Sequence, residues 1–105
     1  MPPKDIKKIN EYRKLFPKTI EVLVNSSPEG GFYAQIKNFP ACYTQAETFA
    51  ELIEMVNDVV ITALEIPEKY IPFMRTYIPP VKDAQRFNIF PTKKMVKSHI
   101  TFSAP

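Results

Sequence analysis

One stretch of the chain combines the start signal of a helix with sustained helical periodicity, and it limits the fold more than any other feature. Thr48 and Glu51 form a capping box, in which the threonine side chain accepts a hydrogen bond from the first helical turn and the glutamate reaches back. Behind this box, apolar residues recur at steps of three and four, as Phe49, Leu52, Ile53, Val56, Val60, Ala63 and Leu64. Pro67 ends the pattern, so we expect one long amphipathic helix over residues 49–66.

Three strands are predicted before this helix. Residues 19–25 alternate between polar and apolar side chains, which is typical of a half-buried strand. The turn cluster SSPEGG follows at 26–31, and residues 32–37 alternate again, so residues 19–37 are predicted to form a hairpin. After the turn residues Asn38, Phe39 and Pro40, we expect a third short strand over 42–46.

The segment after the helix, residues 67–81, mixes four prolines with aromatic and aliphatic side chains. Prolines exclude a long helix, and the segment is too apolar for a disordered linker, so we expect an extended strap over the core. A fourth strand is predicted over 86–90, and residues 98–102 are expected to form an edge strand or an ordered tail. This order predicts an α+β fold, with one antiparallel-type sheet and a single long helix packed on one face.

The 105-residue length fits one domain with two short ends. We assign residues 1–17 to a basic N-terminal arm or short helix, 18–92 to the α+β domain with its strap, and 93–105 to a basic C-terminal tail. The chain begins without a signal-peptide pattern and has no apolar run long enough to span a membrane. We therefore expect a cytoplasmic protein with no membrane partner.

The net charge of +3 is divided unevenly along the chain. Residues 1–18 contain six lysines and arginines against two acids, and residues 82–105 contain five against one, so each end carries +4. Residues 19–81 contain eight acids against three basic residues, which gives −5. An acidic body attracts a basic partner and basic ends attract an anionic one, although solubility alone also accounts for an asymmetry of this size.

The residues that usually carry catalysis are sparse. The only cysteine, Cys42, lies 57 residues from the only histidine, His99, so we interpret it as a small buried side chain. Its place before the helix leaves a thiol nucleophile as the alternative. One cysteine and one histidine cannot form a thiolate–imidazole metal site, and the chain has no glycine-rich phosphate loop or nucleophile elbow. We therefore expect no enzyme, no cofactor and no metal.

Two binding surfaces remain as candidates. The acidic residues at the start of the helix are spaced three or four apart and are predicted to form a ridge of Glu47, Glu51, Glu54 and Asp58. The basic ends favour nucleic acid, for which Tyr12, Phe16 and Phe90 are the nearest aromatic residues that could stack on bases. No helix-turn-helix pair or RRM-type aromatic motif accompanies them, so nucleic acid is possible but not favoured.

Residues 20–66 resemble the HicB-like antitoxins. Members of this family have a strand, an acidic-glycine turn, an aromatic strand and a Pro-Gly-Cys-x-Thr segment that leads into a long helix. The turn at Glu29, Gly30 and Gly31 matches this pattern, and the signature that follows is matched by Phe39, Pro40, Cys42, Thr44, Glu47, Thr48 and Glu51. Ala41 and Ala46 stand where the family tends to have glycine.

The resemblance implies a partial RNase H-like fold of order β-β-β-α-β, without the nuclease's metal-binding acids. It also implies an antitoxin that binds and masks HicA, a small basic mRNA-cleaving toxin, and that assembles as a dimer or tetramer. We choose Glu47, Glu51, Glu54 and Asp58 as the partner-binding residues. Residues 82–105 are too short for the DNA-binding domain that many members append. The alternative is a stand-alone regulator that binds RNA or DNA through its basic ends.

Overall fold

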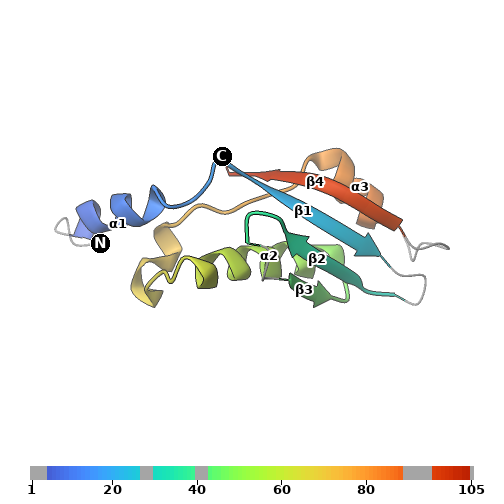
Figure 1. Ribbon diagram of the computed structural model, residues 1–105, viewed down its shortest axis with the longest axis horizontal. Coiled ribbons are helices and arrows are strands. Elements are labelled where there is room, and N and C mark those ends of the chain that lie inside the picture. Colours follow the sequence, from blue (N-terminus) through green and yellow to red (C-terminus); the bar gives the residue numbers. More distant parts are fainter. Residues whose placement is uncertain (1–4, 27–29, 40–42, 89–95, 105) are drawn as a thin grey trace.

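The computed structural model describes residues 5–26, 30–39, 43–88 and 96–104 (Figure 1). Its strands are β1 (Thr19–Ser26), β2 (Phe32–Ile36), β3 (Tyr43–Ala46) and β4 (Val96–Ser103). Its helices are α1 (Ile6–Arg13), α2 (Phe49–Ala63), the 3-10 helix η2 (Glu68–Phe73) and α3 (Val81–Asn88). The predicted α+β class is confirmed, whereas the prediction of a single helix is wrong.

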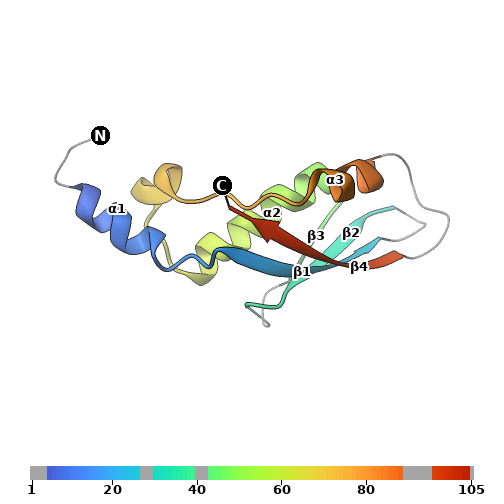
Figure 2. The same ribbon diagram turned by 90° about the horizontal axis from the view of Figure 1, so that it is seen from above.

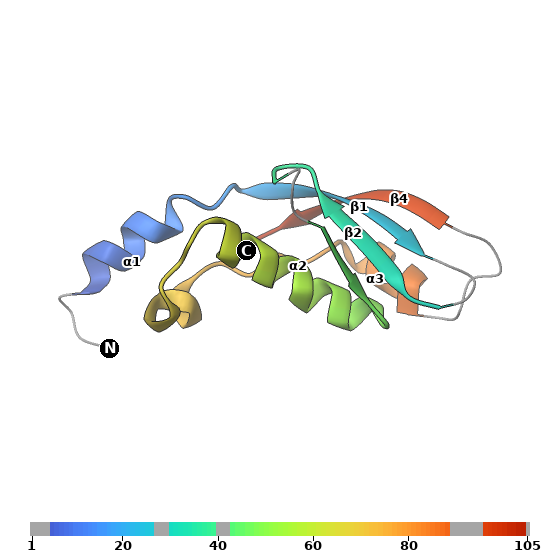
Figure 3. The same ribbon diagram turned by 60° about the horizontal axis from the view of Figure 1, so that its bottom comes forward.

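The four strands form one antiparallel sheet in the order β3-β2-β1-β4. Helices α2 and α3 both lie on one face of this sheet, and no described helix lies on the other face (Figures 2 and 3). The predicted alternation holds on the covered face, where Ile20, Val22 and Val24 of β1 are at most 1% exposed. In the register, Ile36 and Ile100 flank Val22 from the neighbouring strands. The core therefore lies between the sheet and α2.

The turn between β1 and β2 ends in two glycines with positive φ, 99° at Gly30 and 94° at Gly31. Side chains disfavour this backbone region, so the glycine pair is needed there. Residues 27–29, which include the matched Glu29, lie outside the described residues. Ala46 shows no such need, because it lies in β3, is paired with Phe32, and has no positive φ.

Helix α2 begins where the capping box predicts and ends earlier than Pro67. Its N-cap Thr48 accepts a hydrogen bond from the backbone N–H of Glu51 at 3.1 Å. At the other end, the Ile66 N–H donates to Ile61 O and the Glu65 N–H donates to Thr62 O, which is a Schellman motif. Glu65 has φ 53°, so the left-handed residue of this motif ends the helix after Ala63.

The strap is extended only in part, because residues Glu68–Phe73 form η2 before the chain extends toward Ile78. Ile78 pairs with Ser103 at the end of β4, with backbone bonds of 2.9 Å in both directions. The strap is joined to α2 by the side chain of Asn57, which accepts from the Tyr77 N–H and donates to the Tyr77 carbonyl. Tyr77 is fully buried and its phenol donates to Pro17 O.

The strand predicted over 86–90 is wrong, because residues 81–88 form helix α3; residues 89 and 90 lie outside the described residues. The N–H groups of Asp83 and Ala84 both donate to the carbonyl of Pro80 and so begin the helix. The fourth strand is β4, which pairs with β1 over eight residue pairs. The edge-strand alternative for 98–102 is therefore confirmed, and residues 96–103 of the segment predicted as a tail belong to the sheet.

The molecule is elongated, with principal extents of 53, 25 and 20 Å. Helix α1 confirms the short-helix alternative for the N-terminal arm and lies at one end, beyond the sheet (Figure 1). It is attached by Ile9, which is 5% exposed, by Tyr12 on the ring of Tyr70, and by Phe16 stacked on Tyr77. None of the described helices is long and apolar enough to cross a membrane.

Candidate functional site

The residues chosen from the sequence as partner-binding are exposed at the start of α2 and along its outer side. We name them the acidic stripe: Glu47, Glu51, Glu54 and Asp58, all exposed. Within α2, steps of three and four residues place Glu51, Glu54 and Asp58 one above another over about 10 Å of helix axis, and Glu47 precedes the N-cap Thr48. The buried face of α2, formed by Phe49, Leu52, Val56 and Val60, points to the sheet, so Glu54 and Asp58 face away from it.

No basic side chain neutralises the acidic stripe from within α2. The chain contains no lysine or arginine between residues 47 and 68, and none of the four carboxylates makes an ion pair with another residue of the described ranges. Exposed Glu65 and Glu68 continue the negative charge beyond the end of the helix. Like charges at this spacing destabilise a helix by about 0.2–0.5 kcal/mol for each pair. Glu51 stabilises the helix, because a negative charge in the first turn interacts favourably with the helix dipole. Helix stability does not account for the carboxylates of Glu54 and Asp58.

Several of the described signature residues lie near the junction of β2, β3 and α2. A pocket of about 400 Å³ is lined there by Gly31, Phe32, Tyr33, Gln45, Ala46, Glu47 and Glu51. Two stripe carboxylates, Glu47 and Glu51, thus share a concave surface with the turn glycine, Gly31. Thr44 contributes on the helix side, where its hydroxyl contacts the sulfur of Met55 at 3.6 Å. The described signature residues Gly31, Thr44 and Glu51 therefore lie where the sheet meets the N-terminal part of α2.

Two other signature residues, Pro40 and Cys42, lie outside the described residues, so the interpretation of Cys42 as a buried side chain stays a prediction. Phe39 is half-buried against the core, and its N–H donates to Ile36 O at 3.0 Å in the turn after β2. His99 is exposed on β4, on the sheet face opposite the helices. Within the described ranges, no three His, Cys, Asp or Glu side chains converge on a point that could hold a metal ion.

Two of the three aromatic residues considered for base stacking, Tyr12 and Phe16, are packed against other rings. Phe16 is 7% exposed and stacks on Tyr77, Tyr12 packs on Tyr70, and Phe90 lies outside the described residues. Two aromatic side chains that were not considered for stacking, Tyr33 and Tyr43, are 53% and 77% exposed on the uncovered sheet face. The alternation of residues 32–36 already predicts that Tyr33 points away from the core.

The comparisons with known proteins do not identify the chain. No family model, no curated protein and no solved structure matches it. The likeness to HicB-like antitoxins therefore rests on the sequence motif alone.

Proposed function

We propose that the chain is a HicB-like antitoxin that binds and masks a small basic mRNA-cleaving toxin by protein–protein association. The observation that carries this proposal is the acidic stripe: three exposed carboxylates on one side of α2 and a fourth, Glu47, just before it, none of which forms an ion pair with a described residue. A surface of one charge sign attracts a partner of the opposite sign and raises its association rate.

The placement of the signature residues supports the same proposal. Gly31, Thr48 and Glu51 occupy the turn, the N-cap and the first helical turn that the motif requires. The order β1-β2-β3-α2, with β4 added beside β1, agrees with a partial RNase H-like fold, which remains a prediction. Helix α3 and the antiparallel pairing of β4 with β1 are features that the β-β-β-α-β order does not predict. The dimer or tetramer implied by the resemblance also remains a prediction.

The test neutralises part of the acidic stripe without changing its shape. The variant Glu54→Gln/Asp58→Asn removes two exposed charges, and the matched control Glu11→Gln/Glu21→Gln removes two exposed charges on other elements. The probe is the basic protein encoded by the neighbouring reading frame, with association measured by stopped-flow at low and high salt. We expect the stripe variant to associate about 3- to 10-fold more slowly at low salt, with the difference shrinking at high salt. We expect the control to behave as the wild type.

Two results contradict the proposal. In the first, the basic protein encoded by the neighbouring reading frame still cleaves mRNA when an equimolar amount of this protein is added. Masking of that cleavage is the proposed activity. In the second, no basic protein is encoded beside this one. An association rate that changes equally in the stripe variant and in the control refutes the acidic stripe as the binding surface.

A further inference from the structure

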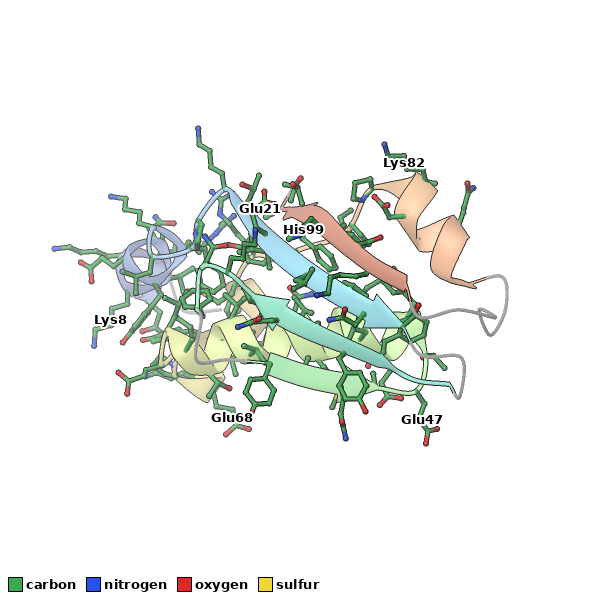
Figure 4. All side chains as sticks on the ribbon, turned by 45° about the vertical axis from the view of Figure 1, so that its right-hand side comes forward. Lys8, Glu21, Glu47, Glu68, Lys82 and His99 are labelled. Atoms are coloured by element: carbon green, nitrogen blue, oxygen red, sulfur yellow. The ribbon has the colours of Figure 1, made fainter. Side chains whose placement is uncertain are left out.

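The sheet face opposite α2 and α3 forms a second surface, which the proposed function does not use. Figure 4 looks onto this face, with Glu21 and His99 on it and Glu47 and Glu68 near its opposite border. We name it the open face. Its outward positions alternate with the buried core positions on all four strands, and they include the two most exposed aromatic rings of the described chain, Tyr33 and Tyr43.

The strand register fixes how these two rings lie. Tyr33 pairs with Gln45 and Tyr43 pairs with Gln35, so the two tyrosines are diagonal neighbours on adjacent antiparallel strands. Diagonal positions of this kind are about 7–8 Å apart. A second pocket, of about 340 Å³, is lined by both rings together with Thr44, Gln45 and Met55. The two rings therefore form one platform with a hollow beside it.

Amide and basic side chains surround this platform. In the row through Tyr33, the register runs Gln45, Tyr33, Asn25 and Lys97 across all four strands. Lys97 is exposed at one end of the row, and exposed Lys37 follows directly after β2. Glu21 is the only carboxylate at the described strand positions of the open face, and it already accepts a hydrogen bond from the Thr101 hydroxyl at 2.7 Å. Glu47, which directly follows β3, and Glu51 line a pocket with Tyr33 and Gln45 at the border toward α2. The positive charge of the open face therefore lies at Lys37 and Lys97, away from this border.

We propose that the open face binds single-stranded nucleic acid. Tyr33 and Tyr43 stack on two bases, the amides of Asn25 and Gln45 hydrogen-bond base edges, and Lys37 and Lys97 contact phosphates. Exposed aromatic rings on an uncovered sheet, beside positive charge, are the combination with which proteins bind single strands. A duplex keeps its bases stacked internally, so it does not offer their faces to the two tyrosines.

The chemistry of the open face disfavours a second protein layer. Sheets that pack face to face bury interdigitated apolar side chains. On the open face, Leu23 is the one aliphatic side chain at the described strand positions, and it is half-buried. Its cross-strand neighbours are Gln35 and exposed His99. The mixture of amides, hydroxyls and lysines matches a hydrated ligand with phosphates better than an apolar partner.

The test measures binding of a fluorescein-labelled oligouridine of about 12 nucleotides by fluorescence anisotropy, since single-strand sites cover about 4–16 nucleotides. The paired variants are Tyr33→Ala/Tyr43→Ala, which removes both rings, and Tyr33→Phe/Tyr43→Phe, which keeps them. We expect each lost ring to weaken binding about 5- to 150-fold, and the phenylalanine variant to bind within about two-fold of the wild type. Circular dichroism checks that each variant is folded.

A salt titration provides a second readout that does not depend on the tyrosine variants. Two phosphate contacts to a single strand contribute a slope of about −1.4 to the dependence of log affinity on log salt concentration. We expect Lys37→Gln/Lys97→Gln to reduce the slope by this amount. The variant Glu54→Gln/Asp58→Asn on the acidic stripe keeps both lysines, so we expect it to keep their share of the salt slope. The salt titration therefore tests the open face whether or not a toxin binds α2.

Four outcomes overturn the proposal. In the first, the folded protein does not bind the oligonucleotide at low salt. In the second, the alanine variant binds it with wild-type affinity. In the third, duplex and single strand compete for the protein equally well. The fourth is a dimer in sedimentation that the alanine variant dissociates, because a second copy of the chain then covers the open face. The proposal is supported if the alanine variant loses binding, the phenylalanine variant keeps it, and Lys37→Gln/Lys97→Gln reduces the salt slope.

Discussion

Asn57 is the residue whose removal should most selectively release the strap from α2. Its side-chain amide donates to Ile53 O within the helix at 2.9 Å and to Tyr77 O across the interface at 2.9 Å. Its carbonyl accepts from the Tyr77 N–H at 2.6 Å. Both backbone polar groups of Tyr77 are thus bound by one side chain from a different element.

The expected cost of Asn57→Ala follows from these bonds. The substitution leaves the N–H and C=O of Tyr77 without partners, and each unsatisfied buried group costs about 1–3 kcal/mol. Because the site is only partly buried, water compensates in part, so we expect the free energy of unfolding to fall by about 2–4 kcal/mol. With an m-value of about 1–3 kcal/mol/M, the urea midpoint falls by about 0.7–4 M.

The assay is urea unfolding followed by far-UV circular dichroism, with amide hydrogen exchange at Tyr77 as the local readout. Asp58→Ala is the matched control, because Asp58 is the next residue on the same helix and its side chain is exposed. An exposed substitution of this kind changes stability by about 0.5 kcal/mol or less. If Asn57→Ala and Asp58→Ala lower the midpoint equally, or if exchange at Tyr77 is unchanged, the reasoning is refuted.

Two further predictions concern the helix end and the buried phenol. Glu65→Gly relieves the positive φ of 53° and should raise the free energy of unfolding by about 1 kcal/mol. The control Glu65→Gln removes only the charge and should raise the free energy of unfolding less. Equal stabilisation of the two variants in thermal unfolding would count against backbone strain at Glu65. Burial raises the pKa of the Tyr77 phenol, and the positive charge of Arg75 lowers it by a smaller amount. The neutral phenol therefore stabilises the folded state fully below about pH 10, and this stabilisation is lost as the pH rises through the folded-state pKa. Tyr77→Phe should cost about 1 kcal/mol at neutral pH, because the bond to Pro17 O is lost. It should also lose stability less steeply above pH 10 than the wild type, and parallel pH profiles would contradict this assignment.

The elements that sequence reasoning predicted correctly are those whose pattern repeats within a short range. The alternation of residues 19–25 and 32–36 and the N-cap at Thr48 are local patterns of this kind, and the structure has all three. The second bond of the predicted capping box, from the Thr48 N–H to the Glu51 side chain, is not among the hydrogen bonds of the described residues. The prediction failed at 86–90, where only a few alternating residues were available and a helix fits them equally well. Pro80 just before a helix, with Asp83 in its first turn, is a start signal that the strand prediction overlooked.

The same distinction holds for the two surfaces. The acidic stripe could be predicted because helical spacing alone places Glu51, Glu54 and Asp58 on the side opposite the apolar face. The open face could not, because alternation shows which way Tyr33 points but not whether another layer covers it. The pairing of β4 with β1, which brings Lys97 opposite Asn25, joins residues far apart in the chain and leaves no local sequence signal.

The distance between the two surfaces determines how their charges affect one another. Glu54 and Asp58 lie on the side of α2 that faces away from the sheet, so about one helix diameter, roughly 10 Å, separates them from the open face, whereas Glu47 and Glu51 line a pocket with Tyr33 and Gln45. The distance of Glu54 and Asp58 exceeds the Debye length of about 8 Å at physiological salt, so a single strand on the open face is largely screened from these two carboxylates there. At about 0.01 M salt the Debye length grows to about 30 Å, and the stripe then repels the same strand. A basic partner that covers Glu54 and Asp58 should therefore strengthen nucleic-acid binding at low salt and change it less at physiological salt, where the remaining coupling comes from Glu47 and Glu51 beside Tyr33.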